Sequence, residues 1–344
     1  MLEAVFPMRA VAAVQPTERL HIGNYFGAVS QSLMYQDIVP RNNFCFVADY
    51  HAQASTENWD KIQERTRSLA VDFLALGLRP GTTVLYRQSD VPEIMEVTWL
   101  LSLVTRHNML ERGHKVREEN MPTAAVYLYP LLMAADILGI RATHVPVGDD
   151  QKQHLDRARE IADRLNRKAQ GNILPVPKGV ATKFARVPGT DALDPKYDNG
   201  VRPKMSKSAE NFIPVFCSDE DTEICVSRIV TRPVKYGHPI NTEDDTIVAL
   251  LRLVVPPTAL TEAEGAMKCG QLGYEDAKGL LTQSINDYFR SARATKPEWE
   301  SRSDDIEEIL REGAATVRAE VLSTLEALRE SMGLKSYRRF TRNR

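Results

Sequence analysis

Short apolar runs alternate with stretches of helical periodicity along the first half of the chain. The runs at 8–14, 43–48, 83–86 and 143–147 are brief and largely uncharged, which predicts buried strands. Between them, apolar residues recur at spacings of three and four, as in helices that cover a sheet. Strands that alternate with helices predict a parallel sheet wound by crossover connections, and therefore an α/β fold.

The pattern changes near residue 214. The Ser218–Glu220 segment (SDE) has the composition of a helix N-terminus, and helical spacing predominates from there on. The longest predicted helix covers residues 304–331. Its apolar positions are Ile306, Leu310, Val317, Val321, Leu325 and Leu328. We therefore expect an α/β domain over residues 1–214 and an all-α domain over residues 215–334.

The composition indicates the kind of protein and its compartment more than its function. The 344 residues are 43% hydrophobic and 26% charged with a net charge of −2, so any nucleic-acid surface must be local. No apolar run reaches the roughly 18 residues that a membrane span needs, and Glu3, Pro7 and Arg9 argue against a signal peptide. The four cysteines show no C-x-x-C pair and no metal-ligand spacing, which indicates reduced thiols, a cytoplasmic protein and no metal site.

The last ten residues, 335–344, form a basic tail. They hold five positive charges interleaved with two aromatic residues. This composition suits contact with an RNA backbone together with base stacking. A frayed, solvated terminus is an equally good interpretation.

One carboxylate stands on an otherwise apolar helical segment. Tyr129, Met133 and Asp136 are spaced by four and three residues, so they share one face. The helix is expected to have Pro130 in its first turn and to end at Gly139. Because an unpaired buried carboxylate is costly, Asp136 needs a committed donor. That donor is either a structural partner, such as an arginine or a backbone amide, or the N–H of a substrate.

Two other segments predict anion sites. The Lys204–Ser208 segment (KMSKS) follows Gly200 and Pro203 and predicts a mobile loop whose ammonium and hydroxyl groups donate to one polyanion, although a solvated basic loop has the same composition. The His21–Asn24 segment (HIGN) lies between the first strand and a helical stretch. A helix N-terminus after a strand favours phosphate, because free amides and the helix dipole face the ligand.

These segments together resemble the two ATP-binding motifs of class I aminoacyl-tRNA synthetases. The Gln15–Thr17 segment (QPT), the helix with Asp136 and residues 150–154 (DQKQH) are similar to the tryptophanyl-tRNA synthetase family. The resemblance covers nearly the whole chain, and it is weaker after about residue 220. It implies a Rossmann-type catalytic domain over residues 1–214, a helical anticodon-binding domain over residues 215–334 and a homodimer.

The resemblance also implies a reaction. L-Tryptophan would attack Mg-ATP to give tryptophanyl-adenylate, and the acyl group would pass to tRNA(Trp), with no covalent nucleophile and no tightly bound cofactor. The implied catalytic residues are His21, Lys204 and Lys207. The implied ATP-binding residues are Gln15, Pro16, Thr17, Gly23, Asn24, Gly148, Asp149, Asp150, Val187, Lys204, Met205, Ser206, Lys207 and Ser208. The implied tryptophan-binding residues are Asp136, Tyr129, Met133, Gln151, His51 and Gln15, and a structural role for His51 is equally open.

The chain departs from the family pattern at two places. Ala12-Ala13 stands where the family usually has Ser-Gly, and Glu18 stands where it usually has Gly. The family also lends a basic side chain to the phosphates from a loop that here holds Lys115 and Arg117. Three alternatives are tyrosine activation by the same fold, a nucleotidyltransferase without an RNA step, and a specialised or non-catalytic paralogue that binds tryptophan or tRNA. An auxiliary enzyme that tolerates tryptophan-like inhibitors also fits the departures.

Overall fold

The computed structural model describes residues 6–16, 19–56, 58–111, 123–147, 152–181, 186–193, 203–207 and 209–334. The chain forms two compact units. Unit 1 comprises Met1–Thr17, Gln31–Thr182 and Arg302–Arg344, and unit 2 comprises Glu18–Ser30 and Lys183–Ser301. These boundaries differ from the predicted change at residue 214. The anticodon-binding role of residues 215–334 remains a prediction.

Unit 1 is built around a five-stranded parallel sheet with the order β3-β2-β1-β4-β5. Its strands are β1 (Ala10–Val14), β2 (Asn43–Val47), β3 (Thr83–Arg87), β4 (His144–Val147) and β5 (Lys178–Ala181). The first four strands confirm the prediction that the four apolar runs form strands. Strand β5 was not predicted, because its residues (KGVA) include a lysine and a glycine and carry little strand signal.

Helices surround this sheet. In unit 1 they are α2 (Ser30–Ile38), α3 (Asp49–Ser55), α4 (Ile62–Ala75), α5 (Glu93–Ser102), α6 (His107–Glu111), α7 (Ala124–Gly139), α8 (Lys152–Ala169) and α13 (Ser303–Ser331), with the 3₁₀ turns η2 (Trp59–Lys61) and η3 (Gln88–Asp90). One hydrophobic core joins β1–β4 to α5, α7, α8 and α13. The sheet with its helices confirms the Rossmann-type α/β fold, and a helical region follows it.

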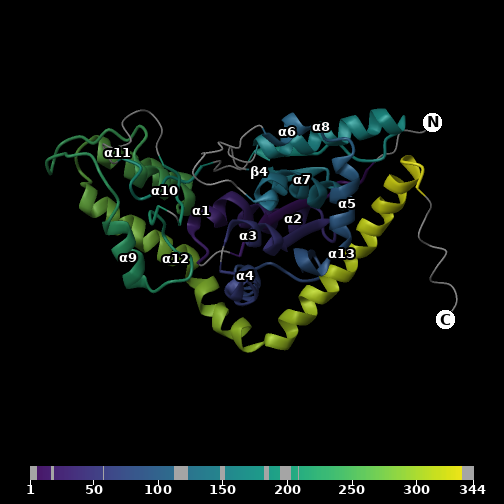
Figure 1. Cartoon of the computed structure of the whole chain (residues 1–344). Helices are drawn as coiled ribbons and strands as arrows, with labels where there is room; N and C mark the ends of the chain where they lie inside the picture. The colour runs from purple at the N-terminus through teal and green to yellow at the C-terminus, as the bar shows by residue number, and fades with distance from the viewer. Residues whose placement is uncertain are drawn as a thin grey trace. The chain divides into compact units, whose positions relative to one another are not determined.

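Helix α13, drawn in yellow in Figure 1, belongs to unit 1. It packs against β3 and α5. All six of its predicted apolar positions are buried, from Ile306 to Leu328. Gly313 marks its closest approach to the sheet, since a Cβ at this position would overlap the carbonyl oxygen of Leu85. The predicted helical face is therefore confirmed, and its partner is the sheet.

Unit 2 consists of short segments and helices. It contains α1 (Ile22–Asn24), the π-helical turn η1 (Tyr25–Val29), α9 (Asp219–Ser227), α10 (Thr246–Val254), α11 (Pro257–Lys268) and α12 (Tyr274–Ser301). The predicted helix start at Ser218 is confirmed, because its hydroxyl accepts from the Asp221 amide at 3.0 Å and caps α9. Helix α12 packs against both α9 and α10.

The strand order places a topological switch at β1. The chain extends the sheet from β1 through β2 to β3, then returns to the other side of β1 with β4. Ligands of open α/β sheets bind at the carboxyl ends of the strands, next to such a switch. Gln15 follows β1, Asp49 and His51 follow β2, and Gln88 follows β3. This edge of unit 1 is therefore where a ligand site is expected.

Candidate active site

Helix α7 carries the predicted carboxylate. Its N-cap is Thr123, whose hydroxyl accepts from the Val126 amide at 3.5 Å, and it ends at Gly139 as predicted. The prediction that Pro130 occupies the first turn is wrong. The preceding residues Ala124–Leu128 are already helical, because the threonine cap starts the helix earlier. Pro130 lies inside the helix, where it cannot donate to the carbonyl four residues before it.

Asp136 is buried beside the first turn of α3 and the η3 turn that follows β3, with only 4% of its surface exposed. Gln88 donates from Nε2 to its Oδ1 at 2.9 Å and to its Oδ2 at 2.8 Å. His51 Nε2 lies 3.0 Å from the same Oδ2. The partners of Asp136 that the sequence left open are therefore an imidazole and a side-chain amide. No arginine and no backbone amide is among its described contacts.

Burial controls the electrostatics of this carboxyl group. It raises the pKa of Asp136, and the contacts with His51 and Gln88 oppose that rise. A carboxylate offers about four acceptor positions. The described contacts use three of them, one on Oδ1 and two on Oδ2. Asp136 is thus held in a fixed orientation with acceptor capacity left on Oδ1.

Tyr129 lies two turns before Asp136 on α7 and faces the same neighbours. Its ring meets His51 edge-on, with centroids 6.1 Å apart. Its hydroxyl lies 2.6 Å from Nε2 of His154, whose Nδ1 lies 2.7 Å from the guanidinium of Arg157. Because an arginine only donates, Nδ1 accepts, and the proton of the neutral ring stands on Nε2 and is donated to the tyrosine.

Met133 is half-buried and packs against the hydrophobic core. Four of the residues predicted to bind tryptophan therefore belong to one part of unit 1: His51, Tyr129, Met133 and Asp136. Gln15 has an exposed side chain just beyond β1. Gln88 was not among the predicted site residues. A polar residue directly after a predicted strand was the available signal.

In unit 2, the two predicted ATP motifs are packed against one another. His21 caps α1: its Nδ1 accepts from the Asn24 amide at 3.2 Å, and its own amide donates to Oδ1 of Asn24 at 3.5 Å. A Cβ at Gly23 would lie 2.9 Å from Nδ1 of His21 and 3.3 Å from Cβ of Met205. Only glycine fits between the histidine and the lysine loop.

A buried asparagine holds the lysine loop. The side chain of Asn211 accepts from the Ser206 amide at 2.7 Å and donates to the Lys204 carbonyl at 3.2 Å and to Asp191 at 2.6 Å. The Met205 amide donates to the carbonyl of Val187 at 2.9 Å. Asn211 was not predicted, because the sequence offers no signal for it beyond its place four residues after the second lysine.

The electrostatics of His21 follow from this packing. Burial, reinforced by the positive charges of Lys207 and Lys204, lowers its pKa to about 3. The ring is therefore neutral at pH 7. Since Nδ1 accepts from the Asn24 amide, the ring proton stands on Nε2, which makes His21 a hydrogen-bond donor rather than a cation.

Several predicted residues lie outside the described part of the chain. They are Thr17, Glu18, Lys115, Arg117, Gly148, Asp149, Asp150, Gln151, Ser208 and the tail over residues 335–344. Among the residues that the structure describes, no group of three or more His, Cys, Asp or Glu side chains is arranged to hold a metal ion. Within the same residues, no helix combines the length and apolar character needed to cross a membrane.

The chain is similar to known proteins of one enzyme family. The family model for tRNA synthetases class I (W and Y) matches residues 5–290. A tryptophan–tRNA ligase of Rhodopirellula baltica is 35% identical over 333 residues, which cover 95% of this chain and 100% of the relative. One from Fusobacterium nucleatum is 36% identical over 331 residues, which cover 95% and 98%.

A solved structure shows the same relationship. Tryptophanyl-tRNA synthetase from Campylobacter jejuni, crystallised with ADP and tryptophan, superposes with a TM-score of 0.79 at 35% identity. The match covers 95% of this chain and 100% of that one. The parallel sheet, the packed segments around His21 and Met205 and the relatives agree: the chain belongs to the tryptophanyl-tRNA synthetase family of class I aminoacyl-tRNA synthetases.

Proposed function

We propose that this protein is a tryptophan–tRNA ligase that activates L-tryptophan with Mg-ATP and transfers it to tRNA(Trp). The observation that carries the proposal is the buried Asp136, oriented by His51 and Gln88 on the ligand-binding edge of the sheet. A buried carboxylate with remaining acceptor capacity suits the indole N–H. A site built to accept a substrate N–H rejects analogues without it by roughly 10⁴-fold or more, so discrimination needs no proofreading.

The other unit 1 residues would complete the tryptophan site. Met133 would pack on the indole ring, and Tyr129, already oriented by His154, would bind the ammonium group together with Gln151. His51 has a second task, because its contact with Asp136 holds the carboxylate in position. Gln15, at the end of β1, would contact both substrates.

Unit 2 would supply the groups that act on ATP. Lys204 and Lys207 would neutralise the phosphates, and His21 would donate a hydrogen bond from Nε2. Gly23 would contact the nucleotide through its backbone, and its lack of a side chain lets His21 and Met205 pack closely. The Asn24 amide holds the histidine ring. The tryptophan carboxylate would attack the α-phosphorus, and the bond from the α-phosphorus to the bridging oxygen would break as pyrophosphate leaves. Mg²⁺ bound with ATP would neutralise charge on the phosphates. Catalysis then rests on positioning and on stabilised charge, as expected for phosphoryl and nucleotidyl transfer.

The proposed homodimer has a candidate surface on α5 and its C-cap residue. Met95, Trp99 and Leu103 are spaced four residues apart and are 40%, 66% and 53% exposed. An exposed apolar stripe of this kind marks an interaction surface. Sedimentation of the wild type is expected to give a dimer, and Trp99→Lys is expected to shift it to the monomer. A monomeric wild type would remove this part of the proposal.

The function is tested by exchange of labelled pyrophosphate into ATP with each of the twenty amino acids. Tryptophan alone should support exchange. Lys207→Ala should lower the exchange rate by about 10²-fold or more, because it removes charge stabilisation in the transition state, while tryptophan binding measured by calorimetry stays the same. Exchange that depends on tyrosine would favour the tyrosyl alternative. Exchange without tRNA charging would favour a nucleotidyltransferase.

A further inference from the structure

Two backbone hydrogen bonds flank the catalytic histidine. The Ile22 amide donates to the Ile213 carbonyl at 3.0 Å, and the Val215 amide donates to the Leu20 carbonyl at 2.9 Å. His21 lies between these bonds, and it also pairs with Pro214 as an isolated antiparallel bridge. The segment 213–215, which follows the lysine loop, therefore sets the position of the histidine backbone.

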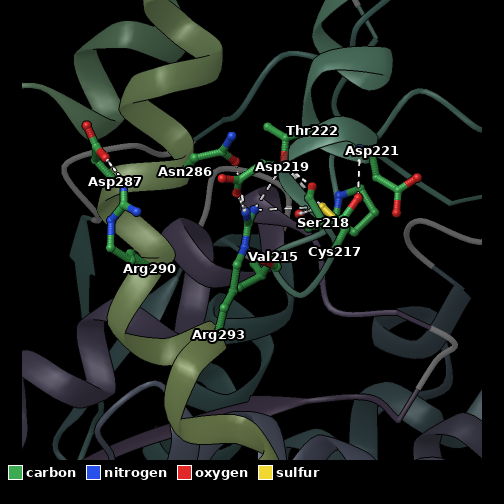
Figure 2. Close-up of polar contacts among 11 residues, drawn as sticks. Val215, Cys217, Ser218, Asp219, Asp221, Thr222, Asn286, Asp287, Arg290 and Arg293 are labelled. Atoms are coloured by element: carbon green, nitrogen blue, oxygen red, sulfur yellow. Dashed lines mark hydrogen bonds and ion pairs between the residues drawn. The ribbon is translucent and has the colours of Figure 1, made fainter.

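One guanidinium holds the end of that segment. Arg293 of α12 donates from Nε to the Val215 carbonyl at 2.8 Å, as Figure 2 shows. Its Nη1 donates to Asp219 at 3.1 Å and to Asn286 at 2.8 Å. Its Nη2 donates to Thr222 at 3.1 Å and to the sulfur of Cys217 at 3.7 Å. Only 14% of the side chain is exposed.

These contacts match the donors that arginine has. A guanidinium carries five N–H groups in a rigid planar fork. Here five acceptors meet them, from the segment 215–217, from the first turns of α9 and from α12 itself. Lysine has a single mobile ammonium group and cannot serve acceptors spread in this way. The arrangement is therefore specific to arginine, and it anchors the carbonyl of Val215 in one place.

We propose that Arg293 is a positioning residue for tryptophan activation. It acts through Val215 and the paired backbone of residues 20–22 on the location of His21. The inference rests on the proposed function of His21 as a donor to ATP. No contact of Arg293 with a substrate is involved. A misplacement of about 1 Å at a reacting group lowers rates by as much as about 10²-fold, so loss of this anchor has a measurable catalytic effect.

The test is a double-mutant cycle in pyrophosphate exchange, with Arg293→Gln, His21→Ala and both together. Arg293→Gln should lower kcat about tenfold or more, with the KM for tryptophan unchanged, because the proposed tryptophan residues belong to unit 1. If Arg293 acts through His21, the double variant should be no slower than His21→Ala alone. Arg290→Gln is the matched control, since Arg290 is on the same helix, 69% exposed, and pairs only with Asp287 among the contacts in Figure 2.

The results of these assays distinguish a failure of the positioning role from a failure of the proposed function. Wild-type rates in Arg293→Gln, or additive losses in the double variant, would overturn the positioning role while leaving the proposed function in place. Absence of tryptophan-dependent exchange in the wild type would instead refute the proposed function. If Arg293→Gln does not fold, Arg293→Lys and Asn286→Ala give the same comparison. Both should then show the loss in kcat without additivity, and normal rates in both would contradict the proposal.

Discussion

Nε2 of Gln88 donates to both carboxylate oxygens of Asp136, at 2.9 and 2.8 Å. Only the amide nitrogen can face a carboxylate, so Oε1 points away, and it is buried with no hydrogen-bond partner among the residues described. A buried acceptor left in this state costs about 1–3 kcal/mol. The orientation of Asp136 is therefore maintained at the expense of stability, which is characteristic of a site arranged for a ligand.

The first prediction concerns the charge of Asp136. Burial raises the pKa of Asp136 in the folded protein. The side chain therefore makes its full favourable contribution to folding below the ordinary pKa of an aspartate, and this contribution is lost as the pH rises through the higher pKa of the folded state. Asp136→Asn has no charge to bury, and rotation of the Gln88 amide restores the pairing. The variant should be more stable than the wild type at pH 7, and the difference should shrink toward pH 4. Urea unfolding at both values measures this, and an unchanged difference would contradict it.

The second prediction uses the depressed pKa of His21, about 3 in the folded protein. A neutral folded form contributes stability above the ordinary histidine pKa near 6.5, and that contribution is lost as the pH falls toward 3. His21→Asn keeps an N-cap acceptor for α1 and cannot become charged. Its free energy of unfolding should match the wild type within about 1 kcal/mol at pH 7 and exceed it at pH 4. Parallel pH profiles of the two proteins would rule out a buried neutral histidine.

The third prediction concerns the support of the lysine loop. A Cβ at Gly189 would overlap the side-chain amide of Asn211, which bonds Ser206 and Lys204. Gly189→Ala should therefore displace the loop and lower the exchange rate about tenfold or more, with tryptophan binding unaffected. Gly279→Ala, a helical position with nothing within 4 Å of the added carbon, is the matched control and should be neutral. Equal rates in the two variants would show that Asn211 does not hold the loop.

The fourth prediction tests the packing of α13 on the sheet. A methyl group at Gly313 meets the rigid backbone oxygen of Leu85, so Gly313→Ala should destabilise the protein by about 3 kcal/mol, at the upper end for overpacking. Gly265→Ala on α11 adds its carbon to open space and should gain about 0.5–1 kcal/mol. Thermal unfolding distinguishes the two. A stable Gly313→Ala variant would mean that α13 does not pack closely on β3.

Much of the fold was predictable because it depends on local patterns. The first four strands are apolar runs, and the buried face of α13 repeats at helical spacing, so each could be identified without its partner. The start of α7 was missed because Pro130 is a stronger local signal than Thr123, although the threonine caps the helix. Periodicity identifies a buried face. It does not identify the element that covers it, which for α13 is the sheet.

In the candidate site too, some residues could be identified from the sequence and others could not. Residues within a motif, such as His21 and Asp136, could be identified from the sequence. Their supporting side chains could not be assigned to them, because Gln88 is 48 positions from its partner and Arg293 is 78 positions from Val215. Such partners are single polar residues brought together only by the fold. The pKa of His21 depends on burial, so its neutral state could not be predicted from the sequence either.

The central claim is that Asp136 accepts the indole N–H of tryptophan. The most direct measurement is the ratio of kcat/KM in pyrophosphate exchange for tryptophan and for its benzothiophene analogue, which has sulfur in place of the N–H group. The wild type should prefer tryptophan by about 10⁴-fold, and Asp136→Ala should lose most of that preference. Comparable rates with the two amino acids in the wild type would contradict the claim.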